Sequence, residues 1–173
     1  PRVTEPARRG FGMRLIEEPL FRPRIIDVGI LADAYGDVAA VGERERSIVD
    51  GERSVLLESP SPLLLGRGDG EAIRVALFEA AGRLFRQLGA LGLGTVTFHI
   101  DADNVVFFDD VVLGLDPAHV LFEMVSGLDL VELELRVAAG QRLPEGLADH
   151  ESSGHAFLAR VLGRRPDGDG EVR

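Results

Sequence analysis

Residues 95–108 read TVTFHIDADNVVFF, and this stretch decides the fold class of the chain. The runs 95–100 and 105–108 are rich in β-branched and aromatic side chains, which favour strands. Between them, DADN at 101–104 supplies residues that favour a turn. We therefore predict a β-hairpin, which requires that at least part of the sheet is antiparallel.

A second hairpin is predicted upstream of the first. The run RIIDVGILA (24–32) is apolar enough for a strand, DAYGD (33–37) has turn composition, and a return strand begins at 38–41. A further strand is predicted at 54–57 and a last one at 155–162. Most of the predicted strands thus neighbour one another along the chain, which favours antiparallel pairing.

Helical periodicity appears between and after the hairpins. Residues 71–88 place apolar side chains on one face of a predicted helix that ends at Gly89. Two more helices are predicted at 116–126, which opens with Asp-Pro, and at 129–140. The order of elements predicts an α+β fold with a mostly antiparallel sheet and helices on one face.

Composition excludes several classes of function. The formal net charge is −10, which disfavours nucleic-acid binding. No apolar run is long enough to span a membrane, and the first residues lack the apolar core of a signal peptide, so a cytoplasmic location is expected. Cysteine is absent, and all 19 basic residues are arginines. Thiol catalysis, Schiff-base chemistry and a P-loop lysine are therefore excluded.

Four motifs follow one another in chain order: GTVTF (94–98), VFFDD (106–110), EMVSGLDLV (123–131) and LRVAAG (135–140). They resemble motifs of the biotin carboxylase family, which includes the carboxylase subunits of acyl-CoA and pyruvate carboxylases. The runs 24–33, 42–48 and 58–62 and the GHA of 154–156 resemble further family segments. The resemblance covers about residues 10–163. It implies that residues 1–143 form a degenerate C-terminal lobe of an ATP-grasp domain. Residues 144–173 would then be a remnant of the carboxylase C-terminal domain, and the two parts would form one compact domain overall.

The resemblance also indicates which catalytic positions have changed. The two glutamates with which the family binds magnesium fall at Thr97 and Asp110. The catalytic arginine and the general-base glutamate fall at Gly114 and Ala118. Because Mg²⁺ commonly needs one or two carboxylates together with phosphates, Asp110 alone is a weak candidate metal ligand. The family's glycine-rich flap resembles ARRGFGM (7–13), where most of the glycines are missing.

Several polar residues allow two interpretations. The aspartates at 101, 103, 109 and 110 could form a metal site, but we favour turn roles for the first two and a strand end for the last two. Asp116 could be catalytic, but we favour a helix N-cap. We interpret His119 as a helix residue rather than a general base, and His155 as structural.

The carboxylase reaction needs metal-neutralised phosphates, a cationic clamp for anions and a base. All three are removed or weakened at the positions above. The resemblance therefore implies a biotin-carboxylase-like domain that has lost carboxylase activity, needs no cofactor and acts as a scaffold, interaction or regulatory module. The alternative is a carboxylase or ligase fragment that binds ATP and Mg²⁺ and is active only with a partner chain. Expected partners are a second copy of the chain or a carboxylase-like subunit, since a truncated fold exposes apolar faces and strand edges.

Overall fold

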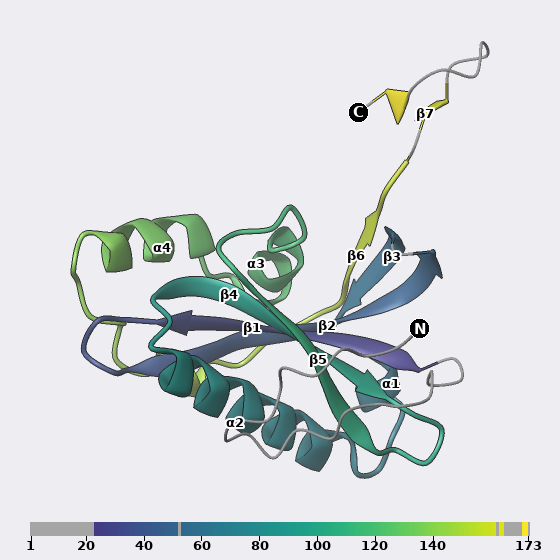
Figure 1. Cartoon of the computed structure of the whole chain (residues 1–173), viewed down its shortest axis with the longest axis horizontal. Helices are drawn as coiled ribbons and strands as arrows, with labels where there is room; N and C mark the ends of the chain where they lie inside the picture. The colour runs from purple at the N-terminus through teal and green to yellow at the C-terminus, as the bar shows by residue number, and fades with distance from the viewer. Residues whose placement is uncertain (1–22, 52, 162, 165–170, 173) are drawn as a thin grey trace, which may run out of the picture.

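The computed structural model describes residues 23–51, 53–161, 163–164 and 171–172. Six antiparallel strands form one sheet in the order β5-β4-β1-β2-β3-β6 (Figure 1). They are β1 (Arg24–Ala32), β2 (Val38–Asp50), β3 (Arg53–Ser59), β4 (Gly92–Ile100), β5 (Val106–Leu113) and β6 (Ala156–Ala159). A separate two-stranded sheet contains β7 (Gly163–Arg164) and β8 (Glu171–Val172). The predicted antiparallel sheet is confirmed, whereas the flap resemblance at 7–13 lies outside the described residues.

Each predicted hairpin is closed by an aspartate that accepts backbone N–H groups. Asp33 Oδ1 accepts from the N–H groups of residues 35 and 37 at 2.8 and 3.0 Å. Asp101 Oδ1 accepts from those of residues 103 and 105 at 2.9 and 2.8 Å. Aspartate favours turns because its side chain bonds the backbone in this way. The turn interpretation of 101–104 is therefore confirmed for Asp101.

Strand β5 is longer than predicted. The expected strand stopped at Phe108, with Asp109 and Asp110 at its end, but β5 continues to Leu113. The register shifts at this point, because Asp110 pairs with Thr97 while Phe108 pairs with Phe98. Asp109 is therefore the extra residue of a β-bulge. Charges and bulges are common on edge strands because they oppose pairing with another chain.

Five helical segments accompany the sheet in the part of the chain that the structure describes. They are α1 (Pro62–Leu65), α2 (Gly70–Leu88), α3 (Val120–Ser126), α4 (Leu130–Ala138) and the 3₁₀ turn η1 (Leu147–Asp149). Gly89 ends α2 with φ 61°, and Asp129 caps α4 by accepting the N–H of Glu132 at 2.8 Å. In the ranges that the structure describes, no helix combines the length and the apolar character needed to cross a bilayer.

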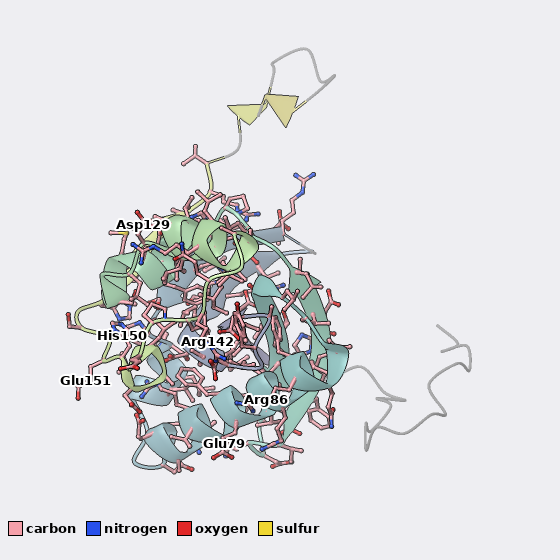
Figure 2. The ribbon with its side chains drawn as sticks, turned by 90° about the vertical axis from the view of Figure 1, so that its left-hand side faces the viewer. Glu79, Arg86, Asp129, Arg142, His150 and Glu151 are labelled. Atoms are coloured by element: carbon pink, nitrogen blue, oxygen red, sulfur yellow. The ribbon has the colours of Figure 1, made fainter. Side chains whose placement is uncertain are left out.

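The helices lie on both faces of the sheet, so the expectation of helices on one face is wrong. Leu77, Ala81 and Phe85 of α2 pack with one set of sheet residues. Phe122 of α3 and Leu130 of α4 belong to a second core on the opposite face. Figure 2 shows this division, with Asp129 beside the α3–α4 layer and Glu79 and Arg86 on α2 across the sheet.

The physical reason for the two-sided arrangement is visible in β1. Every residue from Ile26 to Ala32 is buried. A strand that alternates buried and exposed positions has one wet face, whereas a continuously buried strand must be covered on both. The run 24–32 therefore carried the signal for helices on both faces.

Strand β6 completes the sheet from the C-terminal part of the chain. It pairs with β3, placing Leu158 opposite Leu57. Ala156 of β6 packs in a small core with Leu121 and Val125 of α3. The segment 144–173 thus contributes one strand to the same sheet, and a domain boundary near 143 stays a prediction.

Candidate functional site

A layer of charged residues lies on the sheet face that carries α3. The antiparallel register places Asp27 of β1 between Arg44 of β2 and Thr97 of β4. Because side chains alternate along a strand, Arg46 lies on the same face as Arg44. Asp27, Arg44 and Thr97 are almost fully buried, with 0, 3 and 2% of their surface exposed. Charges removed from water in this way must find partners inside the protein.

Asp27 accepts four hydrogen bonds. Its Oδ2 accepts from Arg44 Nε at 3.1 Å and from Arg46 Nε at 3.0 Å. Its Oδ1 accepts from Arg46 Nη2 at 2.8 Å and from Thr97 Oγ1 at 2.9 Å. A carboxylate offers about four lone-pair sites, so the hydrogen-bonding capacity of Asp27 is filled by protein groups.

Arg44 extends the layer to the loop before α3. Its Nη1 and Nη2 bond the two carboxylate oxygens of Asp116 at 3.1 and 2.5 Å, a bidentate pair. Its guanidinium also lies 5.0 Å from the ring centroid of Phe122 on α3. Arg44 therefore fastens two strands and the α3 segment together.

The expectation that Asp116 is a helix N-cap is wrong in its main point. Helix α3 begins at Val120 and its N-cap is His119. The Asp116 carboxylate still accepts the N–H of Ala118 at 2.6 Å, but its principal partner is Arg44. Burial would raise the pKa of Asp116, but the hydrogen bonds and charge of Arg44 outweigh it, so the pKa lies below its ordinary value.

The Arg46 side chain extends from β2 across β1 and reaches Thr97 of β4. Its Nη2 also lies 3.1 Å from Thr97 Oγ1, and 29% of its side chain is exposed. Burial would lower the pKa of Arg46, but its hydrogen bonds to Asp27 and the charges of Asp27, Asp109 and Asp116 raise it. Three carboxylates, those of Asp27, Asp109 and Asp116, therefore act on the Arg46 guanidinium.

The structure brings together two of the four positions that the resemblance singled out. Asp110 lies directly opposite Thr97 in the β4–β5 register. It is exposed, and its Oδ1 accepts the N–H of Val111 at 2.8 Å. Gly114 has no side chain, and Ala118 is buried with a methyl group. Asp110 as a metal ligand stays a prediction.

These residues do not fit a magnesium ion. The Thr97 hydroxyl is bonded to Asp27, and a guanidinium already lies beside both oxygens. Within the described ranges, no group of three or more histidine, cysteine, aspartate or glutamate side chains could hold a metal ion. His99 lies near Asp109, with 3.4 Å from Nε2 to the carboxylate, and His119 Nδ1 lies 2.6 Å from the carbonyl of Asp116.

Sequence reasoning did not single out Asp27, Arg44 or Arg46. A signal was nevertheless present: Asp27 is the one charged residue inside the apolar run 25–32. Arg44 of the return strand is its register partner, and Arg46 lies two residues further along the same strand. A lone acid in a buried strand requires a partner, so the pattern pointed to an ion pair.

A second buried polar cluster lies on the opposite face, under α1 and α2. Glu45 accepts from Ser61 Oγ at 2.7 Å and from the N–H of Leu63 at 3.1 Å. Glu43 accepts from Arg74 Nε at 3.0 Å. Burial raises the pKa of Glu43 despite the opposing charge of Arg74. This cluster fastens α1 and α2 to the sheet and faces away from the layer around Asp27.

Residues 3–146 match the family described as carbamoyl-phosphate synthase L chain, ATP binding domain. The chain is 34% identical to the mitochondrial methylcrotonoyl-CoA carboxylase subunit alpha of Dictyostelium discoideum, covering 90% of this chain and 22% of that protein. It is 32% identical to biotin carboxylase of Halalkalibacterium halodurans, covering 91% of this chain and 34% of that protein.

Solved structures agree with these matches. A biotin carboxylase complex from Campylobacter jejuni has a TM-score of 0.77 at 32% identity, covering 84% of this chain and 31% of that chain. The biotin carboxylase domain dimer of Hydrogenobacter thermophilus 2-oxoglutarate carboxylase, in complex with MgADP, ADP and bicarbonate, has a TM-score of 0.77 at 26% identity, covering 86% of this chain and 32% of that chain. The chain thus spans about a third or less of these relatives. It belongs to the biotin carboxylase family of ATP-grasp proteins.

Proposed function

We propose that the chain is a non-catalytic member of this family that acts as a scaffold, interaction or regulatory module. The observation that supports this most directly is that the charged groups on the α3 face bind one another. Asp27, Arg44, Arg46 and Asp116 form a closed network, which leaves few free donors for a phosphate or bicarbonate oxygen. Transition-state stabilisation in phosphoryl transfer depends on such donors and on metal ions.

Exposed apolar residues on the α3–α4 layer favour an interaction role. Met124 and Leu135 are each 66% exposed and Val131 is 42% exposed. Val131 and Leu135 line a groove together with Leu128 and the acidic residues of the same segment. Contiguous exposed apolar surface commonly marks a protein interface. We propose a second copy of the chain or a carboxylase-like subunit as the partner, and the relative from Hydrogenobacter thermophilus is itself a dimer.

Light scattering on the full chain, alone and mixed with a purified bacterial biotin carboxylase, tests this proposal. We expect a complex in one of the two samples, and Leu135→Asp should weaken it. Val75→Asp on α2 is the matched control, since Val75 is 47% exposed on the other side of the sheet. A monomer in both samples, or equal weakening by the two variants, contradicts the proposal.

The second candidate is an ATP-binding carboxylase or ligase fragment that is active only with a partner chain. It is favoured by the relatives, whose structures include a beta-gamma-ATP complex and a complex with MgADP. Titration calorimetry of the full chain with ATP and ADP, with and without Mg²⁺, distinguishes the two. Tight, metal-dependent nucleotide binding, or bicarbonate-dependent ATP turnover after a partner is added, supports the hypothesis of an ATP-binding fragment.

The cytoplasmic location stays a prediction.

A further inference from the structure

Arg46 lies where a cation would neutralise the buried oxygens of the α3 face. Its Nη2 is 2.8 Å from Asp27 Oδ1 and 3.1 Å from Thr97 Oγ1, and its Nε is 3.0 Å from Asp27 Oδ2. Strand pairing fixes the backbone of both residues, because Asp27 and Thr97 are register partners on β1 and β4. The hydrogen bond from Thr97 Oγ1 to Asp27 Oδ1, at 2.9 Å, joins the two side chains without involving the guanidinium.

The charges around this point favour a cation. Asp109 and Asp116 act electrostatically on Arg46, and Asp110 faces Thr97 across the β4–β5 pair. Asp27, Asp109, Asp110 and Asp116 together outnumber the guanidinium groups of Arg44 and Arg46 by two. Without Arg46 the excess of negative charge rises to three. A hard divalent cation prefers such carboxylate and hydroxyl oxygens.

We infer that the Arg46 guanidinium takes the place of a metal ion on this face and prevents divalent cations from binding there. This guanidinium neutralises Asp27 permanently, because arginine does not lose its proton in proteins. Replacing Arg46 with a neutral residue opens a divalent-cation site made by Asp27, Thr97 and Asp110. The inference rests on the proposed non-catalytic function and adds to it a role for Arg46. Its test requires neither catalytic turnover nor a partner protein.

The test compares Arg46→Met with the wild-type full chain and with Arg83→Met. Methionine keeps the apolar stem and removes the charge. Arg83 is the matched control, because it lies on α2 and pairs with Glu79 in solvent. The probe is Mn²⁺ alone, followed by electron paramagnetic resonance of the free ion. We expect one Mn²⁺ to bind Arg46→Met at least about tenfold more tightly than it binds wild type or Arg83→Met, the scale on which supporting groups change metal affinity.

Thermal unfolding supplies an independent readout. An ion that binds only the folded state raises the melting temperature, so Mn²⁺ should raise that of Arg46→Met more than that of wild type or Arg83→Met. Arg46→Lys keeps the charge and should show no gain. Adding Asp110→Asn to Arg46→Met should remove most of the gain, which also tests Asp110 as a ligand. If Arg46→Met does not fold, Arg46→Gln carries the same comparisons.

Two results would overturn the inference. The first is that the wild-type protein binds Mn²⁺ as tightly as Arg46→Met does and loses this binding when Asp110→Asn is introduced. Arg46 would then not exclude the ion. The second is an Arg46→Met variant whose Mn²⁺ affinity equals that of Arg83→Met. Neither result bears on the interaction role, which light scattering tests separately, so failure of the inference and failure of the proposed function remain distinguishable.

Discussion

Replacing Arg44 with methionine should cost about 4 kcal/mol of unfolding free energy. Arg44 is 3% exposed and bonds both Asp27, which is fully buried, and Asp116. Removing one partner of a buried ion pair costs about 3–5 kcal/mol, because it leaves an uncompensated buried charge. The lost contact with the Phe122 ring, at 5.0 Å, adds about 0.5–1 kcal/mol. Arg46 and Thr97 still bond Asp27 in the variant, so we expect the total loss of unfolding free energy to stay near the middle of the range of about 3–5 kcal/mol.

Urea denaturation of the full chain, followed by circular dichroism, measures this cost. With a slope of about 2 kcal/mol/M, a loss of about 4 kcal/mol lowers the midpoint by about 2 M. Arg83→Met removes the same charge from a solvent-exposed pair with Glu79 and should cost about 0.5 kcal/mol or less. Equal midpoints for the two variants would refute the argument that the layer around Asp27 holds the α3 segment on the sheet.

Two further outcomes are expected from the same network and its surroundings. The lowered pKa of Asp116 means that its pairing with Arg44 contributes fully above the unfolded pKa of about 3.9 and is lost as the pH falls through the folded value. Urea midpoints measured between pH 5 and pH 2 should therefore fall more steeply for wild type than for Asp116→Asn, and parallel curves would count against the pairing. Gly29→Ala should cost about 1–3 kcal/mol, because its Cβ would lie 2.7 Å from the Phe122 ring. Gly68→Ala, with open space around its Cβ, is the control, and equal melting temperatures for the two would contradict the close packing of α3.

The sequence predicted those elements whose signals are local. Both hairpins follow from turn aspartates that bond N–H groups two and four residues away. The caps of α2 and α4, at Gly89 and Asp129, depend in the same way on neighbouring residues. Such features require no knowledge of the rest of the chain, because the interaction and its signal lie in the same few residues.

The features that were missed depend on partners distant in the sequence. Asp116 has a short-range signal for an N-cap, but its strongest partner, Arg44, lies 72 residues away. The aspartates of β5 indicate a strand end, yet pairing of Asp110 with Thr97 across a bulge keeps them in the sheet. Which residues join the charged layer around Asp27 likewise depends on the strand register, which the sequence alone does not fix. The family resemblance located Thr97 and Asp110, but not the guanidinium that lies beside Thr97.

The pairing of β6 with β3 has a consequence for the synthesis of the chain. About a hundred residues separate Leu57 from its register partner Leu158, so this contact closes a very long loop. During translation β3 emerges early and presents an open backbone edge until β6 follows. We therefore expect the sheet to close late, after β6 has been made, and a chain that stops before Ala156 should leave β3 open to pairing with other chains.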